Sequence, residues 1–270
     1  MAWEIFVSSL ALSLIILLPL SRKIEIPLKT SMSSSLFIGI LAGLIVNGIE
    51  RIYYIKYIHS LILLAFFIFG IFASFLVWRF YRNPERISLE DANTILAPAD
   101  GKIIYVKRYE NGVIPFSKKK GKKYSFSDFI QAEVFPPDGH LIGISMNFIN
   151  VHINRAPMDG RVAIIRHIKG GFISLKKEDA VVLNERALTV IDNGNFKVGV
   201  VQIASRLVRK IVIYFREGQK IRKGERLGMI RFGSQVDLIL PILPSINIEI
   251  RPGEDVKAGV SVVARIVREL

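Results

Sequence analysis

Three long apolar stretches open the chain, and each is long enough to cross a bilayer as a helix. They run from Trp3 to Leu20, from Ser33 to Ile49 and from His59 to Trp78, with short polar loops between them. The third stretch ends in a cluster of aromatic and basic residues, as membrane helices often do at the interface. The pattern therefore predicts that residues 1–80 form a membrane anchor of about three transmembrane helices.

The pattern changes after Asn83 to short runs rich in β-branched residues, many of them separated by Gly, Asn, Asp or Pro. Such runs predict strands joined by turns. The clearest runs are Ile103–Val106, Leu141–Ile144, Val162–Ile165, Val198–Val201, Ile211–Tyr214 and Val260–Val267. Only Ser174–Val182 is compatible with a helix. We therefore expect a mainly β domain over residues 81–270.

Two glycines in the second apolar stretch, Gly39 and Gly43, lie four residues apart. This small-xxx-small spacing lets two membrane helices approach closely. The motif is weak by itself, because two glycines in a membrane-spanning stretch are more often incidental.

Loop charges predict the orientation of the anchor. The loop after the first stretch carries Arg22, Lys23 and Lys29, and three crossings would put it on the same side as the C-terminal domain. Because positive loops stay in the cytoplasm, we expect the domain on the cytoplasmic side of the cell membrane. The chain begins Met-Ala-Trp-Glu, without the basic n-region of a signal peptide, and no small-residue cleavage site follows the first stretch, which indicates a retained anchor.

The composition is typical of a membrane protein, and it excludes several kinds of functional site. Hydrophobic residues make up 51% of the 270 residues, and the mean hydropathy is +0.39. The net charge is +14, and the basic run Lys118–Lys123 predicts either a solvated loop or a finger that touches anionic head groups. With apolar stretches beside it and no nucleic-acid motif, this charge favours a membrane surface over nucleic acid. The lack of cysteine excludes disulfides, thiolate metal sites and cysteine nucleophiles.

Polar clusters beside the predicted strands are the candidates for chemistry. Asp100 precedes a glycine, so an ordinary turn is one explanation and a functional carboxylate is the other. His152, Asn154 and Arg155 come directly after the strand-like run Ile144–Ile149, and His152 is one of only four histidines. A further cluster, Asn184–Arg186, is either a helix end or part of a substrate site.

A Gly-Ser pair, Gly233 and Ser234, lies between the apolar runs Leu227–Ile230 and Val236–Leu240. This pattern predicts a turn or bulge between two strands. A serine hydroxyl held against a strained carbonyl can attack its own main chain, whereas an ordinary turn would have no such role. With a histidine and an aspartate from the clusters above, the serine completes the residue types of a nucleophile, base and orienter set.

Short motifs from Phe80 onward resemble, in order and spacing, those of the phosphatidylserine decarboxylase family, and in particular its short archaeal-type branch proposed to act on archaetidylserine. The motifs are Phe80–Pro84, Ala97–Gly101, Asn150–Pro157, Asn184–Arg186, Gly224–Gly228 and Arg231–Ser234. Each motif is short, but together they are highly specific. The anchor is outside the resemblance and rests on hydropathy.

The resemblance implies a proenzyme that cuts itself between Gly233 and Ser234. The fragments 1–233 and 234–270 would stay associated, and Ser234 would become a covalent pyruvoyl group. That group would form a Schiff base with the amino group of a serine-headgroup phospholipid, phosphatidylserine or archaetidylserine, and accept electrons as CO2 leaves. The implied enzyme is a phospholipid-serine decarboxylase, and it uses no metal.

The resemblance also implies roles for the polar clusters. His152 would be the base for self-cleavage and the proton donor in decarboxylation, with Asp100 orienting it. Asn154 and Arg155 would contact the carboxylate or phosphate of the substrate, since a guanidinium offers a bidentate fork. Longer family members carry a second histidine at the position of Arg155, and most short members carry an arginine at the position of Gln235.

The fold that the resemblance implies is a barrel-sandwich-like arrangement of strands, and a homodimer is a family expectation. Two other functions stay open on the residues themselves. A membrane-tethered β-sandwich that binds lipids or a partner would leave the chain uncut. A membrane-anchored serine hydrolase would keep Ser234 intact and react with serine-directed probes.

Overall fold

The protein is described by a computed structural model that covers residues 2–24, 26–87, 91–117, 123–175, 177, 179–205, 210–230 and 234–267. The chain divides into two compact units. One comprises residues 1–82 together with 147–149, and the other comprises residues 83–146 and 150–270. Each unit is described by itself below.

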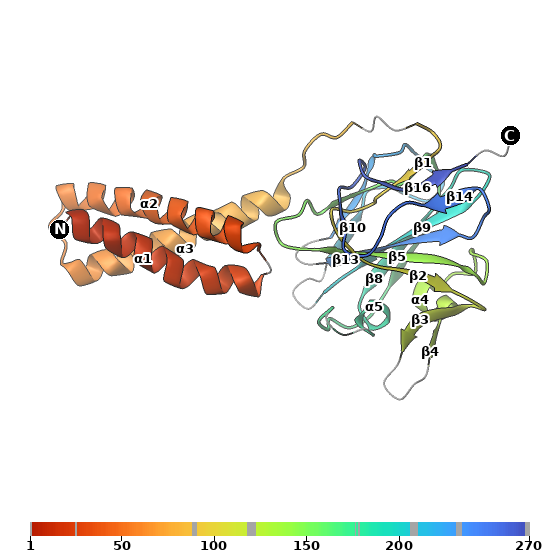
Figure 1. Ribbon diagram of the computed structural model, residues 1–270, viewed down its shortest axis with the longest axis horizontal. Coiled ribbons are helices and arrows are strands. Elements are labelled where there is room, and N and C mark those ends of the chain that lie inside the picture. Colours follow the sequence, from red (N-terminus) through yellow and green to blue (C-terminus); the bar gives the residue numbers. More distant parts are fainter. Residues whose placement is uncertain are drawn as a thin grey trace. The chain divides into compact units, whose positions relative to one another are not determined.

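The first unit contains three long helices, drawn in red to orange in Figure 1. They are α1 (Ala2–Lys23), α2 (Leu28–Ile52) and α3 (Tyr57–Tyr81). Each is long and apolar enough to cross a membrane. Large apolar side chains such as Phe37, Phe66 and Phe69 are exposed on their surfaces, as expected for helices surrounded by lipid. The three predicted apolar helices are confirmed, and each extends a few residues beyond its predicted ends.

The two glycines of the small-residue motif face α1. A Cβ added to Gly39 would lie 2.5 Å from the hydroxyl oxygen of Ser13, and one added to Gly43 would lie 2.6 Å from that of Ser9. The two glycines are therefore not incidental, because they permit the close approach of α1 and α2. Ser9 and Ser13 satisfy their hydroxyls on carbonyls of their own helix, at 2.8 and 2.9 Å.

The second unit is rich in antiparallel strands. Its strands are β1 (Thr94–Leu96), β2 (Gly101–Tyr109), β3 (Val113–Ser117), β4 (Lys123–Ser125), β5 (Gly139–Met146), β6 (Ile153–Arg155), β7 (Gly160–Ile168), β8 (Arg186–Asp192), β9 (Lys197–Ile203), β10 (Ile211–Ile213), β11 (Lys220–Ile221), β12 (Arg226–Ile230), β13 (Ser234–Pro241), β14 (Ile246–Ile248), β15 (Asp255–Val256) and β16 (Val262–Ile266). Two short helices, α4 (Phe126–Ile130) and α5 (Ala180–Leu183), complete it.

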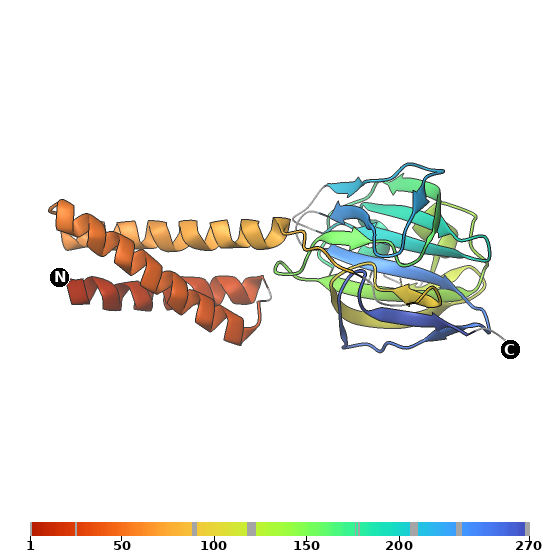
Figure 2. The same ribbon diagram turned by 90° about the horizontal axis from the view of Figure 1, so that it is seen from above.

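One eight-stranded sheet organises the unit, in the order β11-β7-β8-β9-β13-β5-β2-β15. Smaller sheets, β1-β16-β14, β10-β12-β6 and β3-β4, accompany it. The large sheet curls, as Figure 2 shows, and all its strand pairs are antiparallel. The mainly β character is confirmed, whereas the barrel-sandwich arrangement stays a prediction.

Both faces of the central strands are buried, which explains why their sequences are continuous apolar runs. In β13, Val236, Leu238 and Leu240 belong to one apolar cluster, while Ile239 belongs to another. Successive side chains of a strand point to opposite faces, so the two clusters lie on either side of the sheet. Polar side chains inside such a strand must therefore find partners within the protein.

Four of the runs predicted as strands fall within β2, β5, β7 and β9, whereas Ile211–Tyr214 and Val260–Val267 extend beyond β10 and β16. The predicted helix at Ser174–Val182 is largely wrong, because only α5 at its C-terminal end is helical among the described residues. The unpredicted helix α4 begins where the hydroxyl of Ser125 accepts a hydrogen bond from the N–H of Asp128 at 3.0 Å. The Lys-rich run around residues 118–122 lies outside the described residues.

Candidate active site

The predicted cleavage site lies at the start of β13. Ser234 is the first residue of this strand, and its main chain pairs with Met146 of β5. The preceding strand, β12, ends at Ile230, whose N–H donates to the carbonyl oxygen of His152 at 3.3 Å. Residues 231–233 and the side chain of Ser234 lie outside the described part of the structure. Ile230, which contacts the main chain of His152, and Ser234, which pairs with Met146, are thus only four residues apart in the chain.

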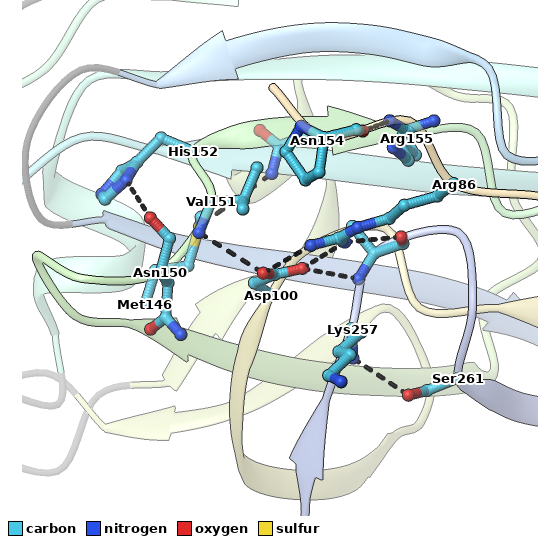
Figure 3. A network of polar contacts seen from close by, with 12 residues as sticks. Arg86, Asp100, Met146, Asn150, Val151, His152, Asn154, Arg155, Lys257 and Ser261 are labelled. Carbon is cyan, nitrogen blue, oxygen red and sulfur yellow. Dashed lines mark hydrogen bonds and ion pairs between the residues drawn. The ribbon is translucent and has the colours of Figure 1, made fainter. Parts of the chain in front are cut away.

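His152 precedes β6, and its side chain is completely buried. Its Nδ1 lies 2.9 Å from the carbonyl oxygen of Asn150. Figure 3 shows the ring turned toward this carbonyl group. A carbonyl oxygen can only accept a hydrogen bond, so Nδ1 carries the proton in this arrangement. The neutral ring then has its basic lone pair on Nε2. The carbonyl of Asn150 therefore selects the tautomer of this imidazole.

Asp100 lies in the turn before β2, and its carboxylate is bound by four donors. Both terminal nitrogens of Arg86 donate to it, at 2.5 and 2.8 Å. The N–H groups of Ala258 and Val151 donate to it at 2.8 and 3.3 Å. Figure 3 shows the carboxylate turned toward Arg86, with a further bond to the main chain of Val151. The structure thus links Asp100 to His152 through the main chain of the residue before it, and a direct action on the imidazole stays a prediction.

Gly101 brings Asp100 close to the strand that pairs with Ser234. Its φ is +151°, and a Cβ at this position would lie 2.1 Å from the carbonyl oxygen of Ser145. Only glycine allows the start of β2 to approach β5 this closely. Lys102 pairs with Ser145 on one side of β5, and Ser234 pairs with Met146 on the other. Asp100 and Ser234 therefore lie at one end of three adjacent strands.

Asn154 and Arg155, the predicted substrate contacts, have partners inside the protein. The Asn154 side chain donates weakly to the sulfur of Met146 at 3.9 Å and accepts a bond from Gln202 at 2.7 Å. Arg155 donates to the carbonyl oxygens of Gly224 and Pro84, at 2.7 and 2.8 Å. Asn154 therefore lies beside the residue that pairs with the predicted nucleophile, whereas Arg155 holds two loops together. Substrate contact by either residue stays a prediction.

Burial lowers the pKa of the Arg155 guanidinium, and the nearby positive charges of Arg86 and Arg226 lower it further. The carboxylates of Glu85 and Asp100 oppose this effect. These five side chains form a charge cluster beside the turn that carries Asp100.

The Asn184–Arg186 cluster joins the end of α5 to neighbouring loops. The Asn184 amide accepts a bond from the N–H of Ile173 and donates to the carbonyl oxygens of Ile173 and Ala204, at 2.8, 2.9 and 2.9 Å. Arg186 donates to the carbonyl oxygens of Asp128, Phe129, Val182 and Asn184. Burial lowers the pKa of Arg186 to about 10. Of the two interpretations of this cluster, these contacts favour the helix end.

A polar cluster of Tyr105, Gln235 and Asp237 was not predicted. Gln235 and Asp237 lie on the face of β13 opposite to Val236 and Leu238. The hydroxyl of Tyr105 donates to the carboxylate of Asp237 at 2.6 Å, and the Gln235 amide donates to both groups, at 2.6 and 2.7 Å. Burial raises the pKa of Asp237 to about 7, although these hydrogen bonds counteract the rise. Burial and the nearby Asp237 carboxylate also raise the pKa of Tyr105 well above its usual value. The sequence signal for this cluster was Asp237, a carboxyl group inside the apolar run Val236–Leu240.

Arg86 was also missed, although it lies close to the predicted motif Phe80–Pro84. Its pairing with Asp100 joins two segments without regular secondary structure that lie 14 residues apart, and no local pattern reveals such a contact. Among the residues that the structure describes, no group of three or more His, Asp or Glu side chains could hold a metal ion.

Comparison with known proteins identifies the family of this chain. The family model for phosphatidylserine decarboxylase matches residues 72–264. A protein of Methanocaldococcus jannaschii, provisionally named archaetidylserine decarboxylase proenzyme, is 40% identical over 185 residues, which cover 68% of this chain and 87% of that protein. The phosphatidylserine decarboxylase proenzyme of Pelodictyon phaeoclathratiforme is 36% identical over 186 residues, covering 69% and 77%. The chain belongs to the phosphatidylserine decarboxylase family.

Proposed function

We propose that this protein is a membrane-anchored proenzyme that cuts itself between Gly233 and Ser234 and then decarboxylates a phospholipid with a serine head group. Membership of the family carries the proposal. It is supported by two contacts: Ser234 pairs with Met146 of β5, and Ile230, four residues earlier, donates to the main-chain carbonyl of His152. The products would be the ethanolamine lipid and CO2.

Self-cleavage needs a nucleophile, a base and a carbonyl. The Ser234 hydroxyl attacks the Gly233 carbonyl carbon while Nε2 of His152 takes the hydroxyl proton. The imidazolium returns this proton to the departing main-chain nitrogen, and an ester replaces the amide. The carbonyl of Asn150 supports this role, because it keeps the proton of the neutral ring on Nδ1.

Elimination completes the cleavage. Loss of the α-proton of residue 234 expels the Gly233 carboxylate and leaves dehydroalanine at the new chain end. One water molecule then hydrolyses this group, with release of ammonia, to leave a pyruvoyl group. The new chain end would stay in place, because β13 pairs with β5 from Ser234 onward and with β9 from Gln235 onward.

The pyruvoyl carbonyl would supply an electron sink for loss of CO2 from the bound serine head group. The residues of the chain then bind the substrate and move protons. We assign to His152 the proton that replaces CO2 on the α-carbon, because its main-chain carbonyl accepts a hydrogen bond from Ile230, four residues before Ser234. Asn154, beside Met146, is our candidate for a contact with the head group. Arg155 contributes positive charge while carbonyl oxygens hold its guanidinium.

The first test is the denatured mass of the purified protein, with Ser234→Ala as the variant and Ser245→Ala as a matched control in the same C-terminal segment. We expect two fragments, 1–233 and 234–270, for the parent and for Ser245→Ala, and one uncut chain for Ser234→Ala. The small fragment should lack a normal N-terminal amine. An uncut parent chain in membranes that have decarboxylase activity would refute self-processing.

The two rival functions give different results in the same preparation. A serine hydrolase would keep Ser234 intact and react with a serine-directed probe, whereas the proposed enzyme would be trapped by borohydride in the presence of an amine. A lipid-binding module would be uncut and unreactive toward both reagents. The comparison therefore separates all three functions, whichever hydrocarbon chains the lipid carries.

We further propose that the helical unit spans the membrane and that the strand-rich unit lies on the cytoplasmic side. The three helices support a spanning anchor, and the basic loop after α1 supports the orientation. Because the chain lacks cysteine, single substitutions can report the side of each segment. We expect an impermeant maleimide to label Lys56→Cys in intact cells, and Asn195→Cys only after permeabilisation. The reverse labelling would overturn the orientation.

A further inference from the structure

The segment that leads from α3 into the strand-rich unit makes specific contacts with that unit. We call Asn83–Arg86 the strap. It has no regular secondary structure, so its position depends on its side chains and on its own carbonyl groups. Three arginines connect it to elements around the candidate active site.

Arg86 is the innermost contact of the strap. Its side chain is 11% exposed and that of Asp100 is 8% exposed, so the pair is largely shielded from water. The two terminal nitrogens of Arg86 each bind one oxygen of the carboxylate, and one of them also donates to the carbonyl oxygen of Ala258 at 2.8 Å. A bidentate pair of this kind fixes the plane of the carboxylate as well as its charge. Figure 3 shows the guanidinium and the carboxylate side by side.

The rest of the strap is bound to the strands that lead to the cleavage site. Arg155 donates to the carbonyl oxygen of Pro84 at 2.8 Å, and Arg226 donates to the side-chain oxygen of Asn83 at 2.9 Å. Arg226 also forms an ion pair with Glu85. Arg155 and Arg226 face each other across β6 and β12, the same pair of strands that brings Ile230 to His152.

The bonds of Asp100 show what its position controls. With Arg86 holding the carboxylate, its oxygens remain aligned with the N–H of Val151 and the N–H of Ala258. Val151 directly precedes His152, and the carbonyl of Asn150, one residue earlier, holds the imidazole. A shift of the Asp100 carboxylate would therefore move the main chain on which the imidazole depends.

We infer that Arg86 is a positioning residue of the active site, which acts through Asp100 and the main chain of Val151 to set the place of His152. This inference rests on the proposed function. The linker to the anchor would then be part of the machinery for self-cleavage and decarboxylation. The partner that Arg86 recognises is the Asp100 carboxylate of its own chain.

The test compares self-cleavage rates of the full chain in detergent, followed by denatured mass, for the parent, Arg86→Ala, Arg86→Lys and Arg265→Ala. Arg265 forms a surface ion pair with Glu249 and is the matched control. We expect Arg86→Ala to slow cleavage about 100-fold, as small displacements of catalytic groups do, and Arg86→Lys to slow it about tenfold. Arg265→Ala should cleave like the parent.

Added guanidinium ion distinguishes positioning from a general loss of stability. Low concentrations should restore cleavage in Arg86→Ala, because the ion can occupy the place of the missing fork, whereas urea at the same concentration should not. Cleaved Arg86→Ala chains should decarboxylate lipid more slowly than the cleaved parent. Their KM for lipid should stay within about twofold of the parental value, since the head-group contacts remain. Cleavage of a folded Arg86→Lys chain at the parental rate would overturn the inference, even if Arg86→Ala fails to fold. An uncut parent chain would instead refute the proposed function itself.

Discussion

Buried charged side chains in this protein are held largely by the main chain. Arg186 binds four carbonyl oxygens and Arg155 binds two. Asp100 binds two main-chain N–H groups in addition to Arg86. An unpaired buried charge is costly, so these hydrogen bonds resist breaking. They therefore hold the main-chain segments that supply the partners in place. Such residues can position a site without touching the substrate.

Asp237 is a buried carboxyl whose protonation should make stability depend on pH. Its pKa is raised by burial from 3.8 to about 7. Between these values the folded protein keeps a proton that the unfolded chain has released. The free energy of unfolding should therefore fall as pH rises through this window and level off above it. Since one pKa unit corresponds to about 1.4 kcal/mol, the total effect is on the order of a few kcal/mol.

Asp237→Asn removes this titration. We subtract the thermal midpoint of the parent from that of the variant. This difference should be more positive at pH 8 than at pH 5, because only the parent loses stability between these pH values. The full chain would be melted in detergent at both pH values, with Asp255→Asn, an exposed position, as the control. An identical difference between Asp237→Asn and the parent at the two pH values would show that Asp237 does not carry the raised pKa.

At the scale of elements, adjacent strands bring the candidate residues together. β13 pairs with β5 over its whole length, and β5 pairs in turn with β2. One close approach, at Gly101, sets how near Asp100 comes to Met146. The site therefore depends on the packing of strands that differ widely in chain position.

Gly101→Ala should disturb this arrangement. The added Cβ would collide with the carbonyl oxygen of Ser145, and the φ of +151° is unfavourable for alanine. We expect a loss of about 1–3 kcal/mol of stability, measured as a lower thermal midpoint of the full chain. Gly171→Ala is the matched control, because the nearest atom to its added Cβ is 3.6 Å away. Equal midpoints for the two variants would contradict the close approach.

At the scale of the whole molecule, self-cleavage would leave the C-terminal fragment interwoven with the rest. Residues 234–270 contribute β13 between β5 and β9, and they also contribute β16 beside β1 and β15 beside β2. Many main-chain hydrogen bonds and both apolar faces of β13 would hold the fragment in place. Cleavage therefore need not release it.

We expect the fragments 1–233 and 234–270 to migrate together in size-exclusion chromatography in detergent and to separate only in denaturant. Native and denaturing mass spectra of the same sample provide the measurement. The uncut Ser234→Ala chain gives the reference position for the intact molecule. Loss of the small fragment under native conditions would show that the strand pairing does not retain it.

Much of the architecture follows from local patterns. Apolar runs of membrane length predicted the three helices, and short β-branched runs predicted many of the strands, because burial imposes a period on each element separately. The motifs around Asp100, His152 and Ser234 pointed to the family, which the comparisons confirm. These signals are properties of short segments, so they can be recognised before the fold is determined.

The partners of the key side chains could not be predicted in this way. The pair of Arg86 and Asp100 joins the strap to the turn before β2. Tyr105 reaches Asp237, 132 residues away, because β2 and β13 flank the same strand. For Asn184 and Arg186 the sequence left a helix end and a substrate site open, and the main-chain partners that favour the helix end are seen only in the fold. Strand register and loop packing select these contacts, and both depend on interactions between distant segments that leave no periodic trace in the sequence.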